Sequence, residues 1–259
     1  MKQPLAYIHP AAKIPSSVVI DPFVTIDQNV EIGEGTRILS GATILEGARI
    51  GAHCTIFPGA VIGAIPQDLK FHGEDTLAVI GDNTTIRECV TVNRGTSAKG
   101  KTVIGSNCLI MAYSHVAHDC VVGDNVIISN ATQLAGEVVV DNFAVIGGGT
   151  LVHQFCHLGA HVMIQGGALI NKDIPPFIKA AREPIAYTGI NSIGLRRRGF
   201  SNETIRDIQE IYRYIYMSSL NVSDAIERIE AELPATKERD EIVMFVRNAK
   251  RGIVRGYFS

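Results

Sequence analysis

A six-residue repeat of aliphatic side chains runs through the first two thirds of this 259-residue chain. Stepping by six from Ile8 to Ile170 gives 28 positions, and 25 of them hold Ile, Leu or Val. The first ten of these positions, from Ile8 to Ile62, are all Ile. An amphipathic helix repeats every 3.6 residues and a strand every two, so neither produces this spacing. The repeat indicates a solenoid built from short, similar units.

A second position follows each aliphatic residue by four places and holds a small or β-branched side chain. It includes four of the five cysteines: Cys54, Cys108, Cys120 and Cys156. Two inward positions per unit describe a short strand, a turn and another short strand, with turns supplied by stretches such as VGDNVI. Three hexapeptides would form one triangular coil, and stacked coils would pair their strands. The sequence therefore predicts a mainly β protein, a hexapeptide parallel β-helix with these cysteines in a core too narrow for Trp.

The repeat fails at positions 68, 74 and 98 but keeps its phase on either side. Each interruption therefore marks a loop that replaces whole hexapeptides. The loops are PQDLKFHGEDTLA at residues 66–78 and SAKGK around position 98. Such loops usually belong to the binding face of a solenoid.

After NKDIPP the repeat stops, which predicts a β-helix over residues 1–186 and an α-helical domain over 187–259. One helix is expected to begin at an N-cap Ser201. A second is expected from a cap at Ser223 to Pro234, and a third over about 237–250. We expect this domain to close the open end of the solenoid, whose sheet edges would otherwise be exposed.

Charge and composition narrow the classes of function. The formal net charge is −2, so no overall positive field favours nucleic acid. The start, MKQPLAYIHP, lacks the apolar stretch of a signal peptide, and no run approaches the roughly 18 apolar residues of a transmembrane segment. Five cysteines without a CxxC pair fit reduced thiols. We expect a cytoplasmic protein.

The coil needs no histidine, yet three of the eight are candidates for a site in corner stretches: His115 and His118 in YSHVAHDC, and His153 in LVHQFCHLGAH. A coil of three hexapeptides places His118, Gly136 and Gln154 in one column. Three interpretations stay open at this point: solvated turn residues, a zinc site, or general-base catalysis with the N–H of Gly136 as an oxyanion donor. The first loop adds three side chains to this candidate surface: Asp68, Lys70 and His72.

Several motifs occur in one order along the whole chain: PQDLKFHGE, IRECVTVNRGT, HVAHDC, LAGEVVV, VHQF, LGAHVM, DIPPF and GLRRRGF. Together they resemble the acyl-acyl carrier protein–UDP-N-acetylglucosamine O-acyltransferases, which catalyse the first step of lipid A synthesis. The resemblance implies a left-handed β-helix and a homotrimer with active sites between neighbouring subunits. It implies two substrates, UDP-N-acetylglucosamine and 3-hydroxyacyl-acyl carrier protein, and no metal or other cofactor.

The same resemblance implies roles for single residues. His118 matches the general base that takes the proton from the sugar 3-hydroxyl, and Gly136 matches the residue whose backbone N–H binds the oxyanion. Other positions match contacts to the sugar nucleotide: Gln67, Asp68, Lys70, His115, His153, Gln154, Asn191 and Arg197. Two positions match those that set acyl-chain length: Met163 and Gly166.

Two positions depart from the family pattern. Glu137 stands where the family usually has His after LAG, and Ile193 stands where it usually has Glu. We expect Glu137 to contact the acceptor and to retune its recognition, because a carboxylate changes local charge and hydrogen bonding. An acceptor with a 3-amino group in place of the hydroxyl stays open.

Arg196 and Arg198 are expected to present a basic surface to the acidic carrier protein, with a solvated approach to a helix as the alternative.

Two other functions are weighed against O-acyl transfer. One is the related N-acyltransferase that acts later in the pathway, which is disfavoured because that family has an extra N-terminal domain whereas the repeat begins at Ile8. The other is a non-catalytic binding β-helix, which would not need the motifs in the corners.

Overall fold

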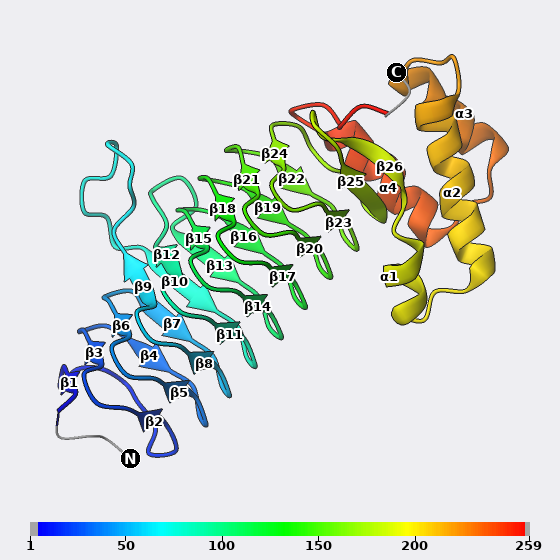
Figure 1. Cartoon of the computed structure of the whole chain (residues 1–259). Helices are drawn as coiled ribbons and strands as arrows, with labels where there is room; N and C mark the ends of the chain where they lie inside the picture. Colours follow the sequence, from blue (N-terminus) through cyan, green and yellow to red (C-terminus); the bar gives the residue numbers. More distant parts are fainter. Residues whose placement is uncertain (1–4, 257–259) are drawn as a thin grey trace.

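The computed structural model describes residues 5–256, which form a three-sided solenoid followed by helices (Figure 1). Short strands stack into three sheets, one on each side of the triangular coil. Sheet 1 contains β1 (Tyr7–Ile8), β3 (Thr25–Ile26), β6 (Thr43–Ile44), β9 (Val61–Ala64), β12 (Thr91–Asn93), β15 (His115–Val116), β18 (Gln133–Leu134), β21 (Leu151–Val152) and β24 (Leu169–Ile170). Sheet 2 contains β4 (Glu31–Ile32), β7 (Ala48–Ile50), β10 (Leu77–Ile80), β13 (Lys101–Ile104), β16 (Val121–Val122), β19 (Val139–Val140) and β22 (His157–Leu158).

Sheet 3 contains β2 (Val19–Ile20), β5 (Arg37–Ile38), β8 (Thr55–Ile56), β11 (Thr85–Ile86), β14 (Leu109–Ile110), β17 (Ile127–Ile128), β20 (Val145–Ile146), β23 (Met163–Ile164), β25 (Ile178–Ala181) and β26 (Ala186–Ile190). Every pairing within the three sheets is parallel except that of β25 with β26. The parallel β-helix predicted from the six-residue repeat is therefore confirmed.

Consecutive regular coils pair at a separation of three hexapeptides, as in the pairing of Gln133 with Leu151 and of Leu151 with Leu169. The aliphatic position points inward, and the small position is also buried. Burial raises the pKa of the Cys120 thiol to about 12, so this thiol stays protonated at neutral pH. The predicted place of four cysteines in the core is confirmed, and Cys89 is the exposed one.

One residue in most corners adopts a left-handed backbone conformation. Examples are Asn125 with φ 58°, Glu137 with φ 61° and Gly149 with φ 69°. Gly and Asn tolerate this conformation at low cost, which explains why turn motifs recur with the repeat.

Both loops replace whole hexapeptides, as predicted. Ile80 pairs with Ile50, five hexapeptides before it, and with Ile104, four hexapeptides after it, instead of at the regular separation of three. The first loop, residues 65–76, stands out from the solenoid in cyan in Figure 1, and the second covers residues 94–100. Both connect a strand of sheet 1 to a strand of sheet 2, so they leave the solenoid at the same corner.

The solenoid ends in a hairpin that the local sequence pattern does not reveal. β25 continues sheet 3 in parallel, and β26 pairs with β25 in antiparallel register, with Ile178 opposite Ile190. The prediction of helix for residues 187–190 is therefore wrong. The edge of sheet 3 stabilises this segment as a strand, and that constraint acts between coils rather than along the local sequence.

Between this hairpin and residue 256, the structure has four helices: α1 (Ser192–Arg197), α2 (Asn202–Met217), α3 (Val222–Glu232) and α4 (Lys237–Asn248). Ser201 caps α2 as predicted, because its hydroxyl accepts a hydrogen bond from Thr204 N at 3.0 Å. The predicted cap of α3 at Ser223 is wrong, since Asn221 accepts from Asp224 N at 2.9 Å and begins the helix earlier. The short helix α1 lies within the predicted α-helical domain, but it is not one of the three helices predicted individually.

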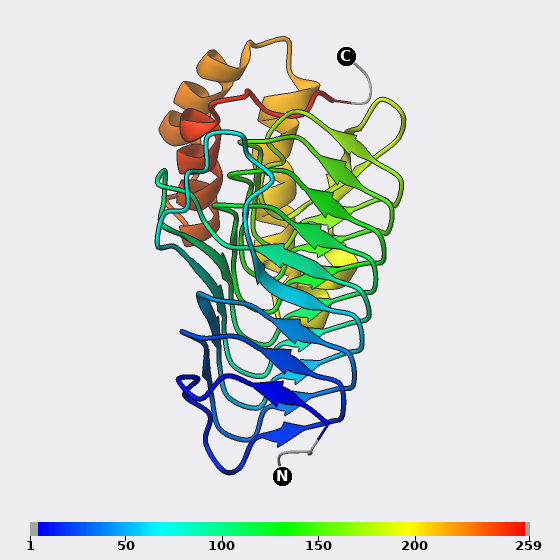
Figure 2. The same ribbon diagram turned by 90° about the vertical axis from the view of Figure 1, so that its left-hand side faces the viewer.

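The C-terminal region closes the end of the solenoid, as expected, but the helices are not alone in doing so. The segment after α4 forms a parallel bridge between Ile253 and Asp173 of the last coil. α4 packs on sheet 2, where the ring of Phe245 lies 4.5 Å from that of His157. Figure 2 shows the helices lying alongside the C-terminal coils as well as beyond their end.

Candidate active site

His118 lies in the corner between β15 of sheet 1 and β16 of sheet 2, the side on which both loops leave the solenoid. Its Nδ1 lies 2.9 Å from Oδ2 of Asp119. The side chain of Asp119 is completely buried, whereas that of His118 keeps 19% exposure. Because the buried carboxylate holds Nδ1, Nε2 is the nitrogen of His118 that is left for a ligand.

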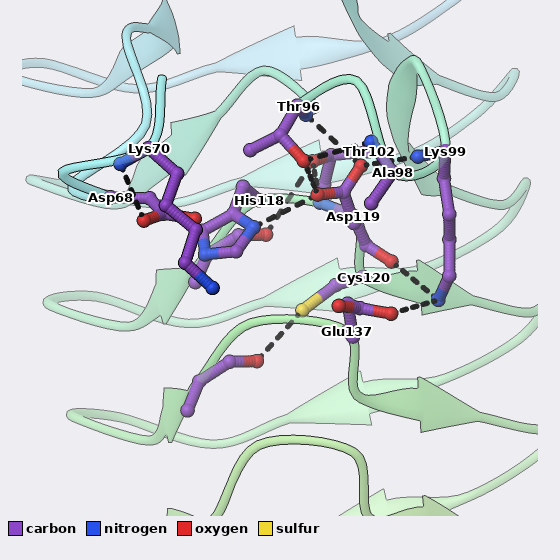
Figure 3. A network of polar contacts seen from close by, with 12 residues as sticks. Asp68, Lys70, Thr96, Ala98, Lys99, Thr102, His118, Asp119, Cys120 and Glu137 are labelled. Carbon is purple, nitrogen blue, oxygen red and sulfur yellow. Dashed lines mark hydrogen bonds and ion pairs between the residues drawn. The ribbon is translucent and has the colours of Figure 1, made fainter.

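The second loop covers Asp119 (Figure 3). The backbone N–H groups of Thr96 and Lys99 donate to Oδ1 at 3.0 and 3.2 Å, and the Thr96 hydroxyl donates to Oδ2 at 2.6 Å. Burial alone would raise the pKa of Asp119, but the hydrogen bonds from Thr96 and His118 outweigh it and hold this pKa below its ordinary value. Asp119 is therefore an ionised partner of the imidazole at neutral pH.

Gly136 lies against the imidazole from the next coil. A Cβ atom added to Gly136 would lie 2.6 Å from both Cε1 and Nε2 of His118, so a side chain there would displace the ring. The stacking of these two residues that a coil of three hexapeptides predicts is confirmed. The backbone N–H of Gly136 has no hydrogen-bond partner among residues 5–256. This corner thus combines a supported imidazole with a free N–H donor.

A cavity of about 630 Å³ opens over this corner and the outer face of sheet 1. Leu151 and Leu169 line its C-terminal part and are 47% and 56% exposed. Its polar side chains, besides that of His118, are Gln67, Asn93, His115, Gln133, His153, Gln154 and Asn171. The cavity therefore offers both polar groups and apolar surface to a ligand.

Two further histidines face this cavity. Nδ1 of His115 lies 2.7 Å from the Thr91 hydroxyl, and burial, reinforced by the nearby His118, lowers the pKa of His115. His115 is therefore a neutral hydrogen-bonding group at neutral pH. His153 is exposed, and its Nδ1 lies 3.1 Å from the carbonyl oxygen of Gln154.

A second cavity of about 500 Å³ lies on the outer face of sheet 3, beside α1. Met163, Asn191 and Arg197 line it, together with the exposed Ile193. Asn191 caps α1, accepting a hydrogen bond from Gly194 N at 3.3 Å. This cavity and the His118 corner thus lie on different sides of the solenoid within one chain.

The two arginines expected to meet a carrier protein have different surroundings. Arg196 is exposed, and its Nε donates to Oδ1 of Asn202 at 3.0 Å. Arg198 is half-buried, donates to the carbonyl oxygen of Phe143 at 3.0 Å and lies 5.4 Å from the centroid of that ring. Arg198 therefore helps to hold the end of α1 on the solenoid, and Arg196 is the freer cation.

Within residues 5–256, no group of three or more His, Cys, Asp or Glu side chains is arranged to hold a metal ion. The interpretation of the corner histidines as zinc ligands therefore finds no ligand set in that range. The same range contains no helix of the length and apolarity needed to cross a bilayer.

The sequence of this chain is similar to known protein families and to proteins of known function. Its residues 173–254 match the model for UDP-N-acetylglucosamine O-acyltransferase, domain 2; residues 101–136 match the bacterial transferase hexapeptide (six repeats), and residues 2–106 the GMPPB C-terminal domain. The acyl-[acyl-carrier-protein]–UDP-N-acetylglucosamine O-acyltransferase of Halorhodospira halophila is 47% identical over 253 residues, which cover 97% of this chain and 98% of that protein. The chain belongs to this family.

Solved structures agree with membership in the O-acyltransferase family. The UDP-N-acetylglucosamine acyltransferase of Bacteroides fragilis has a TM-score of 0.97 and 60% identity, covering 98% of this chain and all of that chain. The enzyme of Francisella novicida has a TM-score of 0.96 and 39% identity, covering 99% and 95%. The protein is therefore an acyltransferase, and its solenoid is a left-handed β-helix, opposite to the usual right-handed crossover.

The O-acyltransferase chain brings only part of the predicted site together. Six of the predicted residues line the first cavity: Gln67, His115, His118, Gly136, His153 and Gln154. Asp68 and Lys70 follow Gln67 on the first loop, where Oδ1 of Asp68 accepts a hydrogen bond from Lys70 N at 3.0 Å (Figure 3). Met163, Asn191 and Arg197 line the second cavity. Gly166 lies in a third place, the corner between sheets 3 and 1, where an added Cβ would lie 3.0 Å from Gly148 O.

Glu137 lines neither of these cavities. Its carboxylate lies 4.0 Å from Nζ of Lys99 on the second loop, and Figure 3 shows this pair. The side chain expected to contact the acceptor is therefore turned toward the loop that covers Asp119.

Three residues that support His118 were not selected from the sequence: Thr96, Lys99 and Asp119. The sequence signal that could have identified Asp119 is its position in HVAHDC, where an acidic side chain directly follows His118. The only sequence signal for Thr96 and Lys99 is the interruption of the repeat at position 98, which gives the place of a loop but not what the loop covers.

Proposed function

We propose that this enzyme transfers a 3-hydroxyacyl chain from acyl carrier protein to the 3-hydroxyl of UDP-N-acetylglucosamine, the first step of lipid A biosynthesis, in the cytoplasm. His118 is the general base, and the Gly136 N–H is the oxyanion donor. The observation that carries this assignment is one corner that joins an imidazole held by a buried carboxylate to a free N–H on the next coil. The substrates follow from the relatives, whose names state an acyl carrier protein and UDP-N-acetylglucosamine.

His118 acts through Nε2. It accepts the proton of the sugar 3-hydroxyl while that oxygen bonds to the carbonyl carbon of the thioester. The carbonyl oxygen becomes an oxyanion, which the N–H of Gly136 stabilises. The C–S bond then breaks, the ester remains on the sugar, and the departing thiolate takes the proton from the imidazolium. The carrier protein leaves as a thiol, so atoms and charge balance.

Asp119 supports both halves of this cycle. Its hydrogen bond to Nδ1 fixes the tautomer in which Nε2 has a free lone pair, and its charge stabilises the imidazolium that forms after proton transfer. Since its pKa lies below the ordinary value, it supplies this charge throughout the neutral range.

The other proposed contacts divide between the two substrates. Lys70 of the first loop is suited to the diphosphate as a point charge. The exposed leucines of β21 and β24, Leu151 and Leu169, offer apolar surface for the acyl chain. The exposed Arg196 remains the candidate contact for an acidic carrier protein.

Asn191 and Arg197, proposed contacts for the far end of the sugar nucleotide, lie in the second cavity and not beside His118. We therefore assign each active site to the junction of two copies in a homotrimer. One copy contributes His118 and Gly136, and its neighbour contributes Asn191 and Arg197. The cyclic symmetry of such a trimer brings these two sides of different copies together.

Mixed trimers test this arrangement. Trimers of His118→Ala alone or of Arg197→Ala alone should have low activity. In a random 1:1 mixture, a junction with both intact residues forms in roughly a quarter of cases, so we expect roughly a quarter of the wild-type rate. The measurement is turnover after co-expression of the two tagged variants. A mixture no more active than the average of the two pure variants would contradict a shared site.

The function itself is tested by release of free carrier thiol. We expect release when the purified enzyme meets both 3-hydroxyacyl-acyl carrier protein and UDP-N-acetylglucosamine. The 3-deoxy analogue of the acceptor should give no release above background, because it has no hydroxyl to attack the thioester. Equal release with this analogue would mean that the 3-position does not react.

A further inference from the structure

The second loop, residues 94–100, is tightly attached to the solenoid. Gly95 N donates to the carbonyl oxygen of Leu77 at 3.1 Å, and Leu77 N donates to the carbonyl oxygen of Gly100 at 3.0 Å. Gly100 N also donates to the carbonyl oxygen of Thr96 at 2.7 Å. These bonds join both ends of the loop to β10, so the loop has one defined shape.

This shape surrounds Asp119. Three hydrogen bonds from Thr96 and Lys99 reach its carboxylate, and Nζ of Lys99 donates to its backbone carbonyl oxygen at 3.0 Å. From the next strand, the hydroxyl of Thr102 accepts a hydrogen bond from Asp119 N at 2.9 Å. Tyr113 occupies the same left-handed position of a preceding corner and is 66% exposed, whereas Asp119 is completely buried. The burial of Asp119 is thus due to the loop and not to the solenoid.

Lys99 also connects two coils. Its Nζ bonds the carbonyl oxygen of Asp119 and lies 4.0 Å from the carboxylate of Glu137, the residue after Gly136 (Figure 3). Glu137 is held in the left-handed conformation of its corner, with φ 61°. One lysine thus links the corner with the general base to the corner with the oxyanion donor.

We propose that Thr96 and Lys99 are positioning residues for acyl transfer, and that Glu137 acts through Lys99 and not through the acceptor sugar. This inference rests on the proposed function of His118 and Gly136. The loop presents three donors to the carboxylate of Asp119 and so fixes the atom that orients His118. Glu137 orients Lys99, which spans the two reacting corners.

Steady-state kinetics can distinguish a positioning role of Thr96 and Glu137 from a role in binding the acceptor. A residue that only positions the base changes kcat and the pH dependence, whereas a residue that binds the acceptor changes KM for the sugar nucleotide. Without the Thr96 hydroxyl, Asp119 loses a bond that favours its ionised form, so its pKa rises. A more basic carboxylate holds the imidazolium more strongly, so the acid limb of kcat/KM should move to higher pH.

The test compares three variants of the intact enzyme over a range of pH. Thr96→Val keeps the shape of the side chain, and we expect roughly tenfold lower kcat, as for loss of a hydrogen bond to a charged group, with an acid limb at higher pH. Thr96→Ser keeps a hydroxyl, so its kcat and the pH of its acid limb should lie close to the wild-type values. Ser97→Ala, at an exposed position of the same loop, is the matched control and should be unchanged. Wild-type kcat and an unmoved acid limb in Thr96→Val would overturn the inference.

Glu137→Gln tests the second part independently of the buried threonine. We expect a lower kcat, with KM for UDP-N-acetylglucosamine within about twofold of the wild type, and the same pattern for Lys99→Met. A several-fold rise in KM with unchanged kcat would return Glu137 to the acceptor site and overturn its assignment. If His118→Ala turned over normally, the assignment of His118 as the general base would fail, and that result is distinct from either outcome for the loop.

Discussion

Gly136→Ala should lower kcat by roughly 10²-fold, the scale of losing one oxyanion donor. The added methyl group would lie 2.6 Å from Cε1 and Nε2 of His118, closer than Cβ atoms approach other atoms in proteins. The ring must move or the backbone of the corner must shift, and either change misaligns Nε2 and the N–H of Gly136. Steady-state kinetics with both substrates gives kcat directly.

The backbone of Gly136 does not need the left-handed conformation that only some residues tolerate, so Ala adds no strain of that kind. We therefore expect Gly136→Ala to unfold at nearly the same thermal midpoint as the wild type, although its kcat is much lower. A variant with wild-type kcat would show that the imidazole does not need its observed position beside Gly136.

His118→Ala should have the largest effect of any single substitution, a loss of roughly 10³-fold in kcat within the range for general-base catalysis. The imidazole is the group in this corner with a free nitrogen and a buried ionised partner. The substitution removes the base but leaves the N–H of Gly136 and the rest of the cavity in place. KM for UDP-N-acetylglucosamine should change much less than kcat.

His53→Ala is the matched control for this substitution. His53 also packs on a glycine of a neighbouring coil, Gly35, but it is exposed and lies outside the cavity of His118. Its removal should leave turnover unchanged. Near-normal turnover of His118→Ala would instead show that His118 is not the general base.

The sequence was sufficient to predict the solenoid because its core repeats with the chain. Each inward position is a local choice of an aliphatic or small side chain, so the period, the coil length and the places of both loops can be read directly. The stacking of Gly136 on His118 follows from that coil length alone. The C-terminal hairpin could not be predicted in this way, because β26 is a strand only through its pairing with β25.

The environment of Asp119 shows why the rest of the site was not predicted. Its burial depends on a loop whose sequence, RGTSAKG, contains no motif for binding a carboxylate. The direction of the Glu137 side chain likewise depends on Lys99, which belongs to the same loop and lies far from Glu137 in the sequence. Contacts between an irregular loop and a regular corner have no period, and so they became visible only in three dimensions.

The position of the new bond tests the central claim most directly. The purified enzyme is incubated with UDP-N-acetylglucosamine and 3-hydroxyacyl-acyl carrier protein, and the acylated sugar nucleotide is examined by NMR. If His118 removes the proton of the 3-hydroxyl, the acyl group should be an ester on O3, and His118→Ala should form almost none of it. Acylation at another atom, or the same ester formed at the wild-type rate by His118→Ala, would contradict this account.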